Sequence, residues 1–179
     1  MNYIQQGYLG ELGLWKYLII PMMFFGLMGL NFFAIVLLDL DVEHIIRQEI
    51  AAKGKNRFLI ESLLPFAIGL IILFLWVKYV HQQSITTLTT SRKKVDWKRV
   101  FFSFGLWTML TIGMLGLDYV MSPDNYQWNF ELVPFLTLAA IAIILVPIQT
   151  SFEEYFFRGY LMQGLGITFK NKWIPLFLT

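Results

Sequence analysis

Long apolar runs separated by short charged stretches constrain this chain more than any other feature of its sequence. The four runs cover residues 14–38, 58–80, 100–121 and 132–148. A helix needs about 20 apolar residues to cross a hydrocarbon core roughly 30 Å thick, so each run is of suitable length. A soluble domain would need a charged surface, whereas only 15% of these 179 residues are charged and 57% are hydrophobic. The sequence predicts an all-α polytopic transmembrane helical bundle in contact with a lipid bilayer.

The basic residues flanking these runs indicate how the chain crosses the membrane. Seven Lys and Arg residues are expected on one side and four on the other. The first group is Lys16, Lys78, Arg92, Lys93, Lys94, Lys98 and Arg99, and the second is Arg47, Lys53, Lys55 and Arg57. The positive-inside rule then predicts that the N-terminus and residues 81–99 face the cytoplasm. The polar stretch 81–90 and the basic stretch that follows it are interpreted as a linker.

Composition also excludes several classes of function. A net charge of +2 argues against a nucleic-acid partner, and the absence of cysteine removes disulfides, thiol nucleophiles and Cys-based metal sites. Glu61 and Asp118 fall within about one helical turn of a predicted span boundary, so we expect solvated interfacial side chains there.

One charged cluster follows the fourth run directly. Glu153, Glu154 and Arg158 stand among apolar residues, where an uncompensated charge is costly. At about 100° per residue, Glu154 and Arg158 lie on one helix face, in the favourable order for an i,i+4 ion pair. Glu153 points about 100° away from Glu154. This spacing predicts a structural ion pair between Glu154 and Arg158 and leaves Glu153 to face a cavity as a candidate general base.

A purely structural explanation fits the same residues. Thr150 and Ser151 each precede a glutamate by three residues, which gives two overlapping capping-box patterns after Pro147. On this alternative the two carboxylates start a helix and are stabilised by its dipole, with no catalytic role.

The segment from Glu153 to Leu161 resembles the EExxxR motif, followed by glycine and an apolar helix face, of the CPBP proteins. This family comprises CAAX-processing and bacteriocin-processing intramembrane proteases, also called type II CAAX endopeptidases or the ABI family. The basic stretch 91–99 before a span is also similar to a loop of many bacterial members. The resemblance implies a protease of the bacterial cytoplasmic membrane with Glu153 and Glu154 in its catalytic motif, where Glu153 and a histidine activate water.

The same resemblance implies peptide or protein substrates tethered to the membrane, either CAAX-like or related to bacteriocins. For the family it implies either a divalent metal ion, zinc, or a metal-free mechanism, and we expect no cofactor in this chain itself. The later histidine motifs of the family are not found. His44 and His81 lie before the glutamates and are interpreted as interfacial residues.

These features predict N-terminal spans over 1–130 and the start of a protease core over 131–179. That core would hold the helix with the EExxxR motif and the beginning of a further span at 173–179. We therefore expect the N-terminal portion of a protease that is inactive as this chain alone. A non-catalytic membrane binding or immunity protein is the alternative. A transporter half would instead need polar residues inside the spans and an inverted repeat.

Overall fold

A computed structural model describes residues 3–170 and 173–179, and these residues form helices without any strand. Four of the helices are long and apolar enough to cross a membrane, which confirms the predicted all-α bundle. The elements in chain order are η1 (Ile4–Leu9), α1 (Leu14–Leu37), α2 (Val42–Lys53), α3 (Lys55–Leu75), η2 (Trp76–Val80), α4 (Ile85–Thr89), α5 (Trp97–Met121), η3 (Pro123–Asn125), α6 (Leu132–Glu154), η4 (Tyr155–Leu161), α7 (Met162–Phe169) and α8 (Trp173–Leu178).

The fourth span differs from its expected form. Helices α6, η4 and α7 form one continuous helix of 38 residues, Leu132–Phe169, in which η4 is a π-helical segment. The apolar run and the charged motif therefore share one helix, although the sequence suggested a span followed by a separate motif helix. Pro147 lies inside α6 without ending it, because a proline removes only one backbone donor and membrane helices tolerate this loss.

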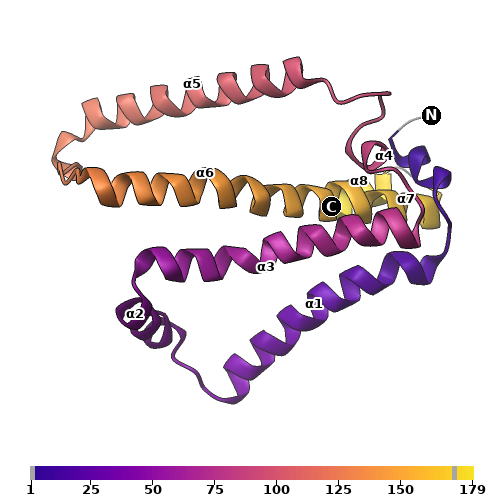
Figure 1. Cartoon of the computed structure of the whole chain (residues 1–179), viewed down its shortest axis with the longest axis horizontal. Helices are drawn as coiled ribbons and strands as arrows, with labels where there is room; N and C mark the ends of the chain where they lie inside the picture. The colour runs from indigo at the N-terminus through magenta and orange to yellow at the C-terminus, as the bar shows by residue number, and fades with distance from the viewer. Residues whose placement is uncertain (1–2, 171–172) are drawn as a thin grey trace.

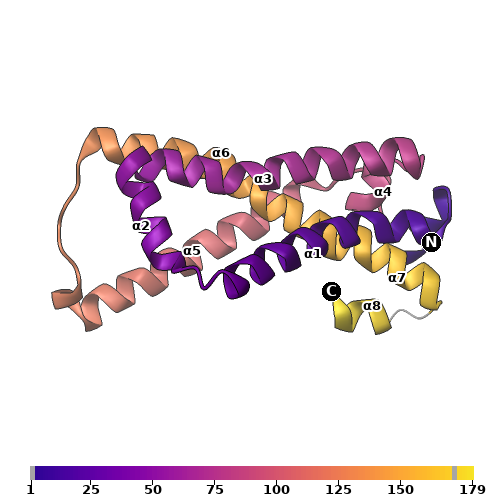
Figure 2. The same cartoon turned by 90° about the horizontal axis from the view of Figure 1, so that it is seen from below.

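The two ends of the bundle are built differently (Figures 1 and 2). At one end, here called the packed end, η1, η2, α4 and α7 gather around the ends of α1 and α3. At the other, the open end, lie α2, η3 and the first turns of α3 and α6. The N-terminal segment and the stretch after η2 meet at the packed end, as the predicted topology requires of two segments on the same side.

The buried side chains concentrate toward the packed end. Leu73 and Val77 from α3 and η2 pack with Leu88 from α4 and with Phe156 and Tyr160 from η4, and all five are at most 1% exposed. Helices α3 and α6 lie side by side and form the main helix pair. Segments from both sides of residue 130 thus share one core.

Two glycines allow the helices of this core to approach closely. A Cβ atom on Gly164 of α7 would lie 2.6 Å from Cδ1 of Tyr17 on α1, and one on Gly69 of α3 would lie 2.8 Å from Cε2 of Phe152. Small residues are the usual means by which membrane helices bring their backbones together. Here each glycine leaves room for an aromatic ring of a neighbouring helix to pack against it.

The interpretation of 81–90 as a linker is wrong. Ser84 caps helix α4, and its side chain accepts a hydrogen bond from the Thr86 amide at 3.2 Å. Leu88 then enters the core, while the side chains of His81 and Gln83 are buried beside it. The polar composition of this segment serves buried hydrogen bonds rather than solvation.

Helix α5 contrasts with the other spans. None of its 25 residues is buried, and Figure 1 shows the helix apart from the α3 and α6 pair. Its start is well defined, because Asp96 caps the helix and forms ion pairs with Arg92 at 2.8 Å and Arg99 at 3.2 Å. The apolar surface of α5 suits contact with lipid or with another membrane segment.

Candidate functional site

The charged motif lies at the end of α6, within the long helix. The ring of Phe152, next to Glu153, packs against Phe66 and Gly69 of α3 and against Phe24 of α1. These contacts lie near the middle of the candidate spans Lys55–Val80 and Leu14–Leu37. Glu153 and Glu154 are therefore level with the interior of both spans rather than with their ends.

The helix-start alternative is wrong. The Thr150 hydroxyl donates to the carbonyl oxygens of Val146 at 3.1 Å and Pro147 at 3.2 Å, so it bonds back to the preceding turn and caps no new helix. Because α6 continues through this region, the carboxylates of Glu153 and Glu154 do not stand at a helix N-terminus.

The predicted ion pair is confirmed. Arg158 Nη1 lies 3.0 Å from Glu154 Oε2, and both side chains are more than half exposed. Glu153 makes a different contact, because its Oε1 accepts a hydrogen bond from Gln149 Nε2 at 3.2 Å. Glu153 is half-buried, so one carboxylate of the motif faces an arginine and the other a neutral amide.

A pocket of about 370 Å³ lies beside the motif. It is lined by Tyr3, Leu88, Thr89, Glu154, Tyr155, Arg158, Gly159 and Met162. Glu154 and Arg158 thus line this pocket and Glu153 does not, which corrects the expectation that Glu153 is the glutamate facing a cavity. The Tyr155 hydroxyl fixes one wall through a 2.9 Å hydrogen bond with the Thr89 hydroxyl.

Aromatic packing holds the motif helix in place. The rings of Phe152 and Phe156 stack with centroids 5.6 Å apart, and Phe24 of α1 packs against both. Phe157 contacts Phe25 of the same helix. The side chains around the glutamates are therefore anchored to α1 on one face of the motif.

The two histidines have different environments. His44 is exposed on α2, in agreement with an interfacial residue, but His81 is fully buried, so the same interpretation of His81 is wrong. His81 Nε2 lies 3.1 Å from the Tyr160 hydroxyl, and Nδ1 lies 3.1 Å from the Glu11 carbonyl oxygen. Burial lowers the pKa of His81, and the nearby Lys16 charge acts in the same direction.

This histidine belongs to a buried polar network that sequence reasoning missed. Tyr160 donates its hydroxyl proton to the Lys16 carbonyl oxygen at 2.6 Å. Next to it, Gln163 accepts from Gln83 Nε2 at 2.9 Å and donates to the Thr87 carbonyl at 3.0 Å. A glutamine inside an apolar segment was the one available signal, because such a group needs buried partners.

The described side chains do not assemble a metal site. Zinc sites in proteins use at least three protein ligands, and residues 3–170 and 173–179 contain no group of three or more His, Asp or Glu side chains suited to a metal. Both nitrogens of His81 already have partners. Zinc, which the family resemblance raised, does not fit these residues by themselves.

Comparison with known proteins gives one relative and no family. The chain is 42% identical over 107 residues to an uncharacterized protein, YyaK, of Bacillus subtilis strain 168. The match covers 59% of this chain and 35% of that protein, so the chain spans about a third of the length of its relative. No family model and no solved structure matches the chain.

Proposed function

We propose that this chain provides the glutamate helix of a CPBP-type intramembrane endopeptidase in the bacterial cytoplasmic membrane. The observation that carries the proposal is that the two glutamates of the motif have different partners. Arg158 neutralises Glu154, whereas Glu153 is half-buried and accepts a hydrogen bond from the neutral Gln149 amide. A general base must contact the water that it deprotonates, and no ion pair between described residues occupies the Glu153 carboxylate.

In the proposed reaction, Glu153 takes a proton from water as the oxygen attacks the carbonyl carbon of a peptide bond. The same carboxyl then returns the proton to the leaving amine as the C–N bond breaks. The Glu154 and Arg158 pair positions the helix and lines the adjoining pocket. Stabilising the oxyanion requires a further donor, which the proposal assigns to a part of the protein beyond these residues or to a partner chain.

The position of the motif, level with the interior of the candidate spans α1 and α3, supports a substrate tethered to the bilayer. A peptide anchored by a lipid group or by an apolar segment is held in the membrane, where it can reach a site between the helices. The proposed substrates are therefore prenylated C-termini of the CAAX kind or bacteriocin-related peptides.

Cleavage of a prenylated peptide by the complete reading frame that contains this sequence, reconstituted in proteoliposomes, tests the proposal. Replacing a general base lowers the rate by about 100-fold or more, so Glu153→Gln is expected to lose at least that much. Arg158→Ala should also lower the rate, because it removes the ion pair that positions Glu154 beside the pocket.

Glu61→Gln is the control, since Glu61 is another span glutamate and, like Glu154, forms an i,i+4 ion pair with an arginine, Arg57, at 2.9 Å. This variant should keep the wild-type rate. Wild-type protein without cleavage, or Glu153→Gln with undiminished cleavage, contradicts the proposal.

A second candidate, a non-catalytic membrane binding or immunity protein, is favoured by one observation. Helix α5 has no buried residue and so presents a whole span for contact with a partner. On this alternative, substitutions on α5 would abolish partner retention while Glu153→Gln would change nothing.

A further inference from the structure

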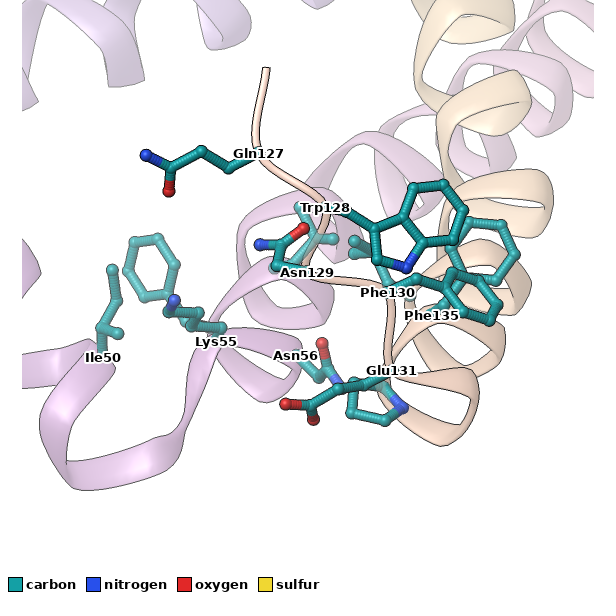
Figure 3. A pocket seen from close by; sticks show the side chains of 13 residues that line it. Ile50, Lys55, Asn56, Gln127, Trp128, Asn129, Phe130, Glu131 and Phe135 are labelled. Atoms are coloured by element: carbon teal, nitrogen blue, oxygen red, sulfur yellow. The ribbon is translucent and has the colours of Figure 1, made fainter. Parts of the chain in front are cut away.

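A cavity at the open end lies far along α6 from the glutamates. It has a volume of about 920 Å³ and opens between α2, the loop after η3 and the first turns of α3 and α6 (Figure 3). Its lining residues are Ile50, Lys55, Asn56, Phe58, Leu59, Gln127, Trp128, Asn129, Phe130, Glu131, Pro134, Phe135 and Leu138. We call it the open-end pocket.

Five of its lining side chains are charged or carry an amide. In the part of the chain that the structure describes, the side chains of Lys55, Asn56, Gln127, Asn129 and Glu131 form no hydrogen bond or ion pair. A cation, a carboxylate and three amides are thus gathered around one cavity with unused donors and acceptors. Figure 3 shows Lys55, Gln127 and Asn129 around the same open space.

Lys55 differs from the bases on either side of it. Lys53 and Arg57 both bind the carboxylate of Glu61, each at 2.9 Å. Lys55 lies between them in sequence but points to the cavity instead. The charges of Lys53 and Arg57 are therefore paired with Glu61, whereas the Lys55 ammonium has no ion pair among the described residues.

Aromatic rings form a second wall of the open-end pocket. The ring centroids of Trp128 and Phe130 are 6.0 Å apart, and those of Phe130 and Phe135 are 5.2 Å apart. Trp128 is 91% exposed, which is typical of an aromatic residue at a membrane interface. An exposed indole face also attracts ammonium groups.

The pocket changes from polar to apolar along the spans. Lys55 and Glu131 stand where α3 and α6 begin, and Phe58, Leu59 and Leu138 follow one or two turns further into the predicted membrane region. This order matches a molecule with a charged head in the interface and hydrocarbon below it. A free sugar or a soluble phosphate has no hydrocarbon chain and would contact only the polar part of the pocket, around Lys55 and Glu131.

We propose that the open-end pocket binds the headgroup of a zwitterionic phospholipid, a phosphate diester that carries a primary ammonium group. The Lys55 ammonium pairs with the phosphate, while Glu131 and the Trp128 ring receive the lipid ammonium. The three amides supply donors for the ester oxygens, and the acyl chains follow the apolar faces of α3 and α6. This site is separate from the glutamate motif and does not depend on the proposed protease activity.

Native mass spectrometry of the detergent-solubilised protein with added lipid tests the proposal. We expect phosphatidylethanolamine to be retained more strongly than phosphatidylglycerol, which has the phosphate but lacks the ammonium group. Loss of one charge-assisted contact should weaken binding by roughly tenfold. Lys55→Ala should therefore weaken both lipids, whereas Glu131→Gln should weaken phosphatidylethanolamine alone and abolish the preference.

Lys98→Ala is the matched control, since Lys98 is also an exposed lysine in the first turn of a span. It should leave both affinities unchanged. Glycerophosphoethanolamine, the headgroup without acyl chains, should compete poorly, because the apolar half of the pocket stays empty. Equal retention of both lipids, competition by a phosphate-free glycolipid, or Lys55→Ala and Glu131→Gln variants that bind like wild type would each overturn the proposal.

Discussion

Both the packed end and the open end contain amide side chains, but these side chains are hydrogen-bonded at the packed end and face a cavity at the open end. At the packed end the amides of Gln83 and Gln163 bond each other and the backbone in a buried site. At the open end the amides of Gln127 and Asn129 face a cavity without partners in the described residues. The comparison indicates that the packed end holds the bundle together, whereas the open end is free to bind.

The glycines repeat this contrast. Gly164 faces a buried aromatic ring at the packed end, but within the described residues no atom outside its own helix lies within 4 Å of a Cβ placed on Gly113 of α5. A small residue is thus required in one place and only tolerated in the other. Substitutions in the core that contains Tyr17 and Leu88 should therefore lower the free energy of unfolding, whereas substitutions in α5 should change it little.

The largest expected effect comes from filling the close approach. Gly164→Leu should lower the free energy of unfolding by about 3 kcal/mol, because its side chain would overlap the buried ring of Tyr17, whose Cδ1 lies 2.6 Å from the Cβ position. Gly113→Leu should change it by less than about 0.5 kcal/mol. Unfolding by SDS titration in detergent micelles measures both. Equal losses would remove the distinction between the two ends.

A smaller loss is expected from the buried amide. Gln163→Leu removes the partner of Gln83 and of the Tyr3 and Thr87 carbonyl oxygens, and leaving such groups unsatisfied costs about 1–3 kcal/mol. The matched change at the open end, Gln127→Leu, breaks no hydrogen bond between described residues and should be nearly neutral in the same titration. A stable Gln163→Leu variant would show that the network is dispensable.

His81 should make the packed end sensitive to acid. Burial lowers its pKa below the ordinary value of 6.5, so the unfolded chain gains a proton that the folded chain resists. Stability is then complete above about pH 6.5 and falls as the pH drops toward the folded-state pKa. Thermal unfolding between about pH 7.5 and 5.5 measures this slope.

Variants of the two histidines test whether His81 causes this pH dependence of stability. His81→Gln should flatten it, while His44→Gln, at an exposed position on α2, should leave it unchanged. Lys16 and Glu11 are the charged residues whose effects reach His81, and neither is altered in these variants. A slope that survives His81→Gln would assign the acid sensitivity elsewhere.

The sequence predicted those features that depend on neighbours along the chain. Apolar run length found all four spans, and i,i+4 spacing found the Glu154 and Arg158 pair. The packed end escaped prediction because its partners are distant: Gln83 and Gln163 are 80 residues apart, and His81 and Tyr160 are 79 apart. No local pattern encodes such contacts. The assignment of Glu153 as a general base stays a prediction.

The smallest expected effect on stability concerns the ion pair beside the candidate site. Arg158 and Glu154 are both more than half exposed, and exposed pairs contribute roughly 0–1 kcal/mol. Arg158→Gln should therefore unfold within about 1 kcal/mol of wild type in the SDS titration, although it lies next to the packed end. Arg57→Gln, which breaks the Arg57 and Glu61 pair at the open end, is the matched control and should behave alike. If Arg158→Gln instead unfolds as readily as Gln163→Leu, charge as well as packing stabilises the packed end, and a loss of cleavage by Arg158 variants would reflect unfolding rather than a role in the motif.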